Sequence, residues 1–165
     1  MSAHFRYTAA RHALEYSFNT STKHKRVNYP RSDTLARASH LYSRGFNPFC
    51  GDEVVLRLKM DSYSRIELIR FQGQGCSISQ ASASILTQLV MEKRIGEAQT
   101  MSLLLRKLMK GHDLSNVEMD MLGDMESLKG VQQFPIRIKC ALLPWATLDD
   151  CIAEYQEKPM PPEKN

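Results

Sequence analysis

Apolar and polar residues alternate along two stretches near the middle of the chain. The first, residues 53–60, places four apolar side chains between more polar neighbours: Val54, Leu56, Leu58 and Met60. The second, residues 65–71, alternates in the same way after a short polar turn at residues 61–64. Alternation with a period of two is typical of a strand with one buried face. The pattern therefore predicts two strands joined as a hairpin.

A helical spacing of apolar residues replaces this alternation after Cys76. Apolar positions then fall on one helical face: Ile78, Ala81, Ile85, Leu89 and Val90. We expect Ser77 or Ser79 to cap the start of this helix, because a serine hydroxyl can accept a free backbone N–H of the first turn.

Further helices are expected in the C-terminal half of the chain. One covers about residues 97–110, and a capping box at Ser115–Glu118 predicts the start of a short helix. Residues 123–130 continue as helix or loop. The last helix covers about residues 140–157 and has Pro144 in its first turn, where proline is tolerated.

The order of these elements indicates an α+β fold. Residues 6–18 fit a helix ahead of the strands, residues 34–46 are ambiguous, and helices follow the strands. A chain of 165 residues is long enough for one domain with a sizeable core and short for two. We therefore expect a single domain over residues 1–157 and a frayed tail over residues 158–165.

Positive charge is concentrated near the N-terminus. The chain carries a net charge of +4, and Lys and Arg far outnumber Asp and Glu within residues 1–46. Such a segment can be an organelle transit peptide or a nucleic-acid-binding arm, but the scattered basic residues and the lack of a recognition motif favour a folded, solvated segment. The sequence has no apolar stretch of the roughly 20 residues that span a bilayer. We expect a cytoplasmic protein without nucleic-acid or membrane partners.

The four cysteines indicate metal or thiol chemistry rather than a disulfide framework, because the chain has no recognisable secretory signal. Cys50, Cys76 and Cys140 are separated by 26 and 64 residues, which matches no zinc-finger pattern. Spacing alone therefore leaves unrelated buried thiols as an equal alternative. Together with Asp52, the three thiols would suit zinc, or iron in a cluster, better than calcium or magnesium.

The neighbours of these cysteines favour metal binding. Gly73 and Gly75 come just before Cys76 and permit close approach of the backbone to a ligand. A thiol at a helix N-terminus is biased toward the thiolate form, and we expect this of both Cys76 and Cys140.

Asp52 follows Cys50 by two positions, so both side chains can point to one side if Gly51 is extended. The alternative is an exposed carboxylate in a turn. Three thiolates and one carboxylate would leave a divalent ion with excess negative charge, which Arg137 and Lys139 are placed to offset.

We do not expect Cys151 to bind the same ion. In a continuous helix it would lie on the same face as Cys140 but about 16 Å away along the axis, at about 1.5 Å per residue. A buried cysteine that packs as a small hydrophobe is the favoured interpretation. His112, which follows Gly111 at an expected helix end, is also not expected to be a ligand.

Three segments resemble the SufU branch of the IscU/NifU-N superfamily. They are Asn47-Pro48-Phe49-Cys50-Gly51-Asp52, the run from Phe71 through Gly73-Gln74-Gly75-Cys76 to Ser84, and Phe134-Pro135-Ile136-Arg137-Ile138-Lys139-Cys140. The resemblance covers residues 47 to about 155. Tyr29-Pro30-Arg31 also falls where the family has a similar element after its first helix, which favours a folded N-terminal segment over a transit peptide.

Two features separate the branches of this superfamily. Scaffold-type members carry a histidine just before the last cysteine, where this chain has Lys139. SufU-type members have a longer segment between the second and third cysteines, and residues 76–140 match that longer form. Both features favour SufU.

The resemblance implies a small three-stranded antiparallel sheet packed by helices, and zinc held by Cys50, Asp52, Cys76 and Cys140. It further implies a pyridoxal-phosphate-dependent cysteine desulfurase of the SufS type as partner, which would pass persulfide sulfur to Cys50. Arg137 would serve in docking or charge balance, and a downstream iron–sulfur scaffold would receive the sulfur.

The predicted function is thus zinc-dependent sulfur transfer for iron–sulfur cluster biogenesis. One alternative is a scaffold that holds a transient [2Fe-2S] cluster on the same residues. Another is a zinc-stabilised adaptor that activates the desulfurase without accepting sulfur.

Overall fold

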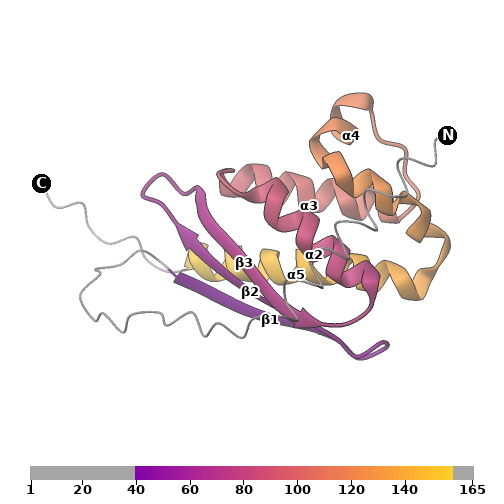
Figure 1. Ribbon diagram of the computed structural model, residues 1–165. Helices are drawn as coiled ribbons and strands as arrows, with labels where there is room; N and C mark the ends of the chain where they lie inside the picture. The colour runs from indigo at the N-terminus through magenta and orange to yellow at the C-terminus, as the bar shows by residue number, and fades with distance from the viewer. Residues whose placement is uncertain (1–39, 158–165) are drawn as a thin grey trace, which may run out of the picture.

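The structure is a computed structural model and describes residues 40–157. These residues form an antiparallel sheet with helices on one face (Figure 1). Its strands are β1 (His40–Asn47), β2 (Asp52–Met60) and β3 (Ile66–Gln74), in the spatial order β1-β2-β3. Both neighbouring pairs are antiparallel. The predicted α+β class and the small three-stranded sheet are confirmed.

The predicted hairpin is formed by β2 and β3. The side chain of Asp61 shapes its turn, because Oδ1 accepts the backbone N–H groups of Tyr63 and Arg65, both at 2.8 Å. β3 runs three residues beyond the predicted end, to Gln74. The ambiguous stretch before the hairpin contains β1, which pairs with β2 along its whole length.

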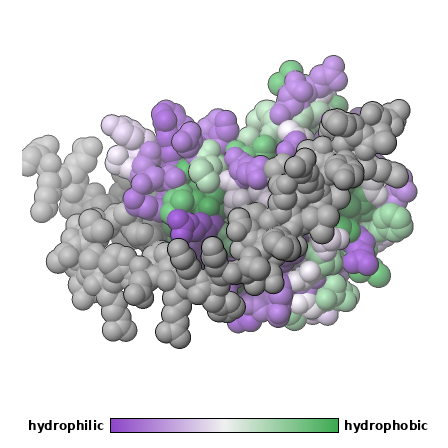
Figure 2. All heavy atoms as spheres, viewed as in Figure 1, coloured by the Kyte–Doolittle hydropathy of each residue, from purple (hydrophilic) through white to green (hydrophobic). Residues whose placement is uncertain are grey.

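The alternating pattern of β2 sets which face of the sheet is covered. The side chains of Val54, Leu56, Leu58 and Met60 are buried, whereas Arg57 is exposed and lies over the ring of Tyr42 on β1 at 5.9 Å from its centroid. The sheet therefore has one face against the core and one toward solvent. On the coloured part of the surface in Figure 2, hydrophilic side chains surround smaller hydrophobic areas.

The helices are α2 (Ser77–Val90), α3 (Ile95–Met109), α4 (Asn116–Leu122) and α5 (Pro135–Glu157), with a 3-10 helix η1 (Gly123–Gln133) before α5. α5 packs along β1 and β2, and α2 packs against β3 and α5 (Figure 1). α3 and η1 pack against α5 farther from the sheet. The buried apolar residues of all these layers form one hydrophobic core.

The helix boundaries follow the sequence signals in part. Gly111, with a φ of +81°, lies two residues beyond the end of α3, close to the predicted end. The predicted capping box at the start of α4 is confirmed, because Ser115 Oγ accepts the N–H of Glu118 and the Glu118 carboxylate accepts the N–H of Ser115. The predicted serine cap of α2 is wrong, since Cys76 occupies the N-cap position.

α5 begins at Pro135, earlier than predicted. Proline suits the first position of a helix because its missing N–H would have no partner there. Cys140 consequently lies in the second turn, and Pro144 lies inside the helix rather than in its first turn. Pro144 has no N–H to donate to the carbonyl of Cys140, so one helical hydrogen bond is lost next to the candidate site.

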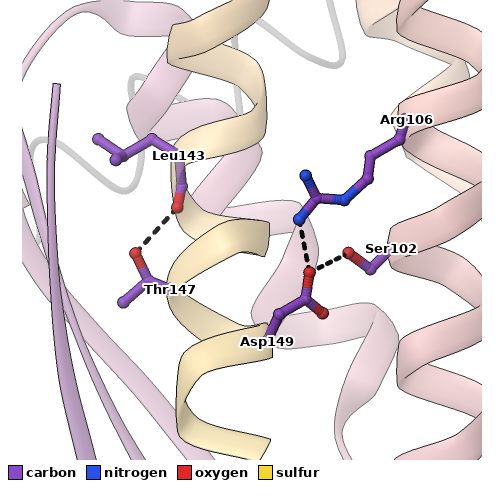
Figure 3. A network of polar contacts seen from close by, with 5 residues as sticks. All are labelled: Ser102, Arg106, Leu143, Thr147 and Asp149. Atoms are coloured by element: carbon purple, nitrogen blue, oxygen red, sulfur yellow. Dashed lines mark hydrogen bonds and ion pairs between the residues drawn. The ribbon is translucent and has the colours of Figure 1, made fainter. Parts of the chain in front are cut away.

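Two sides of α5 contact different layers (Figure 3). On one side, Asp149 accepts hydrogen bonds from Ser102 Oγ at 2.8 Å and Arg106 Nη2 at 2.6 Å, both on α3. On the other side, Thr147 lies against Gly45 of β1, where a Cβ would overlap the threonine hydroxyl. Glycine at residue 45 therefore lets β1 approach α5 closely.

Some predictions concern residues outside this range. The helix over residues 6–18, the Tyr29-Pro30-Arg31 element and the tail over residues 158–165 lie outside the described residues. The assignment of residues 1–157 to a single domain stays a prediction. Within residues 40–157, no helix is long and apolar enough to cross a membrane.

Candidate metal centre

Cys50, Asp52 and Cys140 meet where the turn between β1 and β2 lies against the start of α5. One ligand atom from each lies within 4.8 Å of the other two. Cys50 is in the turn, Asp52 is the first residue of β2, and Cys140 is on α5. The fold thus brings together three of the four residues predicted as ligands in one tight group.

A tight turn presents Cys50. Asn47 and Asp52 pair across the two strands, and the N–H of Gly51 donates to the carbonyl of Asn47 at 2.8 Å. Gly51 has a φ of +72°, a conformation that favours glycine. Gly51 is therefore not extended, the condition considered for the two side chains to point to one side, yet the turn still brings Cys50 and Asp52 together. Cys50 is exposed as a residue, and its thiol is partly buried beside Cys140.

Asp52 is buried, with only 1% of its surface exposed, which excludes the alternative of an exposed turn carboxylate. Its Oδ1 accepts the backbone N–H of Cys76 at 2.9 Å, and its Oδ2 accepts the thiol of Cys76 at 3.2 Å. Burial by itself would raise the pKa of Asp52. Hydrogen bonds from Cys50, Cys76 and Cys140 outweigh burial and lower the pKa below its usual value, so the carboxylate is ionised at neutral pH.

Cys76 joins the group through Asp52. It is the N-cap residue of α2, as the sequence predicted for a thiol at a helix start. A Cβ on Gly75 would lie 2.7 Å from the Asp52 carboxylate and 2.8 Å from Ser79 Oγ, and a Cβ on Gly73 would overlap the Glu53 carbonyl. Gly75 therefore lets this segment approach the Asp52 carboxylate, and Gly73 lets the end of β3 lie close to the backbone of β2.

Cys140 is the most enclosed of the three thiols. Its Sγ lies 3.2 Å from Cys50 Sγ and accepts from Asn47 Nδ2 at 3.7 Å. Burial raises the pKa of the Cys140 thiol, and its contacts with Cys50, Asp52 and Cys76 raise it further. The expected thiolate bias from a helix N-terminus is wrong for Cys140, because the helix starts five residues earlier.

These groups fit a soft or borderline cation. Three thiols and an ionised carboxylate are the donor types that zinc and iron prefer, and a positive ion at this position would favour the thiolate of buried Cys140. The donor set is less suited to calcium or magnesium, which take oxygen ligands. The assignment of Cys50, Asp52, Cys76 and Cys140 as the ligands stays a prediction.

The structure adds Asn47 to the candidate site. Asn47 is 4% exposed, and its Oδ1 accepts the N–H of Phe49 at 3.1 Å while its Nδ2 donates to Cys140. One side chain thus holds both the turn and the thiol on α5. The Asn-Pro pair signals a turn in the sequence, but its contact with a residue 93 positions away could not be seen there.

The two basic residues before Cys140 are both exposed. Lys139 reaches the turn, and its Nζ lies 3.5 Å from the centroid of the Phe49 ring. Arg137 lies in the first turn of α5, one helical turn before Cys140. A role for either in charge balance or docking stays a prediction.

The fourth thiol is separate from the site. Cys151 is fully buried on α5, and burial, followed by the charges of Glu154 and Asp150, raises its pKa to about 12. The burial confirms the interpretation of Cys151 as a buried residue that packs as a small hydrophobe. His112 is exposed beyond the end of α3.

Comparisons with known proteins give the family. The model of the NifU-like N terminal domain matches residues 26–141. The chain is 44% identical over 110 residues to the zinc-dependent sulfurtransferase SufU of Bacillus subtilis, covering 67% of this chain and 73% of that protein. It is 41% identical over 106 residues to the iron–sulfur cluster assembly scaffold protein IscU of Streptococcus pyogenes, covering 64% and 65%.

The fold has relatives among solved structures as well. A putative iron–sulfur cluster assembly scaffold protein for the SUF system, SufU of Fervidobacterium islandicum AW-1, superposes with a TM-score of 0.69 at 29% identity, covering 88% of this chain and 98% of that one. The sequence match spans more than half of the chain and includes Cys50, Asp52, Cys76 and Cys140. The chain therefore belongs to the family of NifU-like N-terminal domains.

Proposed function

We propose that this protein is a zinc-dependent sulfurtransferase that accepts persulfide sulfur from a cysteine desulfurase for iron–sulfur cluster biogenesis. The observation that carries the proposal is the thiol of Cys50, an exposed residue that a turn holds beside the ionised Asp52 and the thiol of Cys140. The sulfurtransferase SufU, 44% identical over the matched region, supports the same chemistry.

Cys50, Asp52, Cys76 and Cys140 would hold the zinc ion. Zinc bound there would supply the positive charge that keeps thiols deprotonated at neutral pH. The chain itself contributes the arrangement of the donors, through Asn47 on one side of the turn and the N–H of Cys76 on the other.

Cys50 is the thiol best placed to react with another protein. It is exposed, whereas Cys76 is half-buried and Cys140 is buried. Thiol exchange requires a thiolate that can reach the sulfur it attacks. Of the three clustered thiols, Cys50 is the one that another protein can reach without a change in the surrounding helices.

In the proposed transfer, one sulfur atom passes from a persulfide on the desulfurase to the thiolate of Cys50. The Cys50 thiolate attacks the terminal sulfur of a cysteine persulfide on the desulfurase, a new S–S bond forms at Cys50, and the S–S bond on the desulfurase breaks. The desulfurase cysteine leaves as a thiolate, and the proton of the terminal sulfur stays with that sulfur. Cys50 is oxidised to a persulfide and the desulfurase cysteine is reduced to a thiolate, so the exchange needs no other oxidant or reductant.

The partner in this proposal is a pyridoxal-phosphate-dependent cysteine desulfurase of the SufS type, and the sulfur then passes to an iron–sulfur scaffold. Arg137, exposed one turn before Cys140, is placed to contact such a partner. We place the reaction in the cytoplasm, because a reducing compartment keeps the four free cysteines as thiols.

The test is to incubate the full-length protein with a pyridoxal-phosphate-dependent cysteine desulfurase and cysteine, and to map added sulfur by mass spectrometry. We expect the mass of one sulfur atom on Cys50 and faster desulfurase turnover. The Cys50→Ala variant should show neither, while Cys151→Ala should behave as the wild type because Cys151 is buried away from the cluster. Undiminished stimulation by Cys50→Ala would refute the assignment.

A scaffold for a transient [2Fe-2S] cluster is the second candidate, because the same donors suit iron and a scaffold protein is 41% identical over the matched region. Against it, scaffold-type members are expected to have a histidine where this chain has Lys139, and the Lys139 ammonium lies over Phe49. Protein purified without added metal separates the two candidates. Stoichiometric zinc and no visible absorption support sulfur transfer, and a coloured iron-containing protein supports the scaffold.

A further inference from the structure

We propose that Lys139 and Phe49 form a latch that holds the Cys50 turn against α5 and that opens when Cys50 is presented for reaction. Lys139 is then a positioning residue that acts through the Phe49 ring. The consequence for sulfur transfer rests on the proposed function. The latch itself can be tested without any desulfurase.

The geometry of the pair is that of a cation–π contact. Lys139 Nζ lies 3.5 Å from the centroid of the Phe49 ring, well within the roughly 6 Å over which the face of an aromatic ring attracts a cation. Phe49 is 68% exposed and Lys139 is also exposed. The contact therefore lies at the surface, where a partner can reach and replace it.

The position of the pair gives it control over Cys50. Phe49 directly precedes Cys50, and Lys139 directly precedes Cys140. The Lys139–Phe49 contact thus joins the same two segments as the 3.2 Å approach of Cys50 Sγ to Cys140 Sγ. Because Cys50 directly follows Phe49 in the short turn between Asn47 and Asp52, a shift of the Phe49 backbone that follows release of its ring would move Cys50 as well.

The turn has a fixed side and a side that can be released. On the fixed side, buried Asn47 binds the N–H of Phe49 and the thiol of Cys140, and buried Asp52 begins β2. On the other side, the Phe49 ring is held from above by a flexible, solvated lysine. An exposed cation–π contact is weak enough to be broken by a docking protein, whereas the buried contacts of Asn47 and Asp52 are not exposed to one.

Charge balance is the competing role for Lys139, and it makes a different prediction. If Lys139 acts only through its charge on the thiols, the aromatic ring is irrelevant and Phe49→Leu has no effect. If the latch exists, Phe49→Leu frees the turn without changing any charge. The ring variant is therefore the primary test.

The experiment measures the alkylation rate of Cys50 by iodoacetamide in the full-length protein, read by mass spectrometry. Rates are taken at the pH plateau of each variant, so that a changed thiolate fraction does not contribute, and at equal metal content. We expect Phe49→Leu and Lys139→Met each to alkylate about two- to fivefold faster than the wild type, the factor that corresponds to an exposed cation–π contact. Phe49→Tyr and Lys139→Arg, which keep a ring and a cation, should stay near the wild-type rate.

The double variant provides the decisive comparison. If the two residues act through one contact, Phe49→Leu with Lys139→Met is no faster than either single variant. Tyr42→Leu is the matched control, because it removes another exposed ring that lies under a cation, Arg57, at a distance from the turn. That variant should leave the Cys50 rate unchanged.

Two results would overturn the latch: a wild-type rate in Phe49→Leu, or effects of the two single variants that multiply in the double variant. Failure of the proposed function looks different. In that case no sulfur reaches Cys50 from the desulfurase in the wild type, while the alkylation rates still report on the latch.

Discussion

The carboxylate of Asp52 binds Cys76 twice, accepting its backbone N–H at 2.9 Å and its thiol at 3.2 Å. Asp52 begins β2 and Cys76 caps α2, so this pair of contacts ties the Cys50 turn to the first helix after the sheet. Because α2 packs on both β3 and α5, the candidate metal centre is connected to the main layers of the fold.

From this connection we expect Cys76→Ser to lose metal and stability together. A serine hydroxyl can still donate to Asp52, but it is a poor ligand for a soft or borderline ion, and metal binding contributes directly to the free energy of folding. We expect metal affinity to fall at least about tenfold. Metal content and the melting temperature with and without a chelator measure both effects.

In that experiment the chelator should lower the melting temperature of the wild type and leave that of Cys76→Ser nearly unchanged. Cys151→Ser is the matched control, since it makes the same change at a buried thiol outside the cluster and should keep its full metal content. Full metal content in Cys76→Ser would remove Cys76 from the ligand set.

Gly75→Ala tests the close approach around Asp52. The added Cβ would lie 2.7 Å from the Asp52 carboxylate and 2.8 Å from Ser79 Oγ, so one of these groups must shift. Displacement of a supporting group typically costs a metal site about 10- to 100-fold in affinity, and we expect a loss of that size. Competition with a chromophoric chelator gives the affinity.

Gly96→Ala is the control for this change, because a Cβ on that exposed glycine of α3 would meet open space. In a helix, alanine in place of glycine should raise the free energy of unfolding by about 0.5–1 kcal/mol and leave metal affinity unchanged. Equal metal affinity in the two alanine variants would show that the approach of Gly75 to Asp52 does not matter for binding.

The strands of the sheet differ in how well the sequence predicts them. β2 is evident because its alternating apolar side chains match one buried face. β1 has no such pattern in its residue types, because its more buried positions after Leu41 are Ser43, Gly45 and Asn47, while the aromatic side chains of this strand are exposed. Its strand conformation follows from pairing with β2 over eight positions, a tertiary effect that local periodicity does not carry.

The sequence pattern places the start of α5 five residues too late, for a related reason. Phe134 and Ile136 are exposed, so the first turn has no buried apolar stripe to indicate a helix. Pro135 was the available signal, because proline is favoured at the first position of a helix. The error also changes the chemistry, since it moves Cys140 away from the helix N-terminus.

The candidate site was predictable in its residue types but not in its contacts. The resemblance to a family, rather than the spacing of 26 and 64 residues, pointed to Cys50, Cys76 and Cys140. Asp52 accepts hydrogen bonds from Cys76, 24 residues away, and the Lys139–Phe49 contact joins the turn before β2 to α5, the last helix. Such pairs are set by the fold, so no local pattern reveals them.

Asp149→Ala tests the connection between α3 and α5 that Figure 3 shows. Asp149 accepts from Ser102, which is 1% exposed, and from the more exposed Arg106. Most of the loss in stability should come from the buried Ser102 hydroxyl, which loses its acceptor. The ion pair with Arg106 should contribute little, because both of its side chains are partly exposed. We expect the free energy of unfolding to fall by about 1–2 kcal/mol, measured by urea denaturation.

The neighbouring Asp150→Ala serves as control, since Asp150 is exposed and should change stability by no more than about 0.5 kcal/mol. Ser102→Ala combined with Asp149→Ala should cost little more than Asp149→Ala alone, because both remove one interaction. Additive losses would mean that the two residues stabilise the fold independently.

Cys151 gives a prediction for alkaline pH. Burial, with help from Glu154 and Asp150, raises the pKa of its thiol to about 12 in the fold, whereas a cysteine in an unfolded chain has a pKa of about 8.5. As the pH rises above about 8.5, the unfolded chain loses this proton and the folded protein keeps it, so stability falls. The stabilising effect is complete below that pH and is lost between the two pKa values.

Replacing Cys151 with serine removes this titration while leaving the clustered thiols in place. The free energy of unfolding of the wild type should therefore fall relative to that of Cys151→Ser, by up to about 1.4 kcal/mol per pH unit above about pH 8.5. Urea denaturation in the presence of a reductant, from about pH 7 to pH 10, measures the difference. Parallel stability curves would show that Cys151 ionises as readily in the fold as in the unfolded chain, and that its burial does not protect it from reaction.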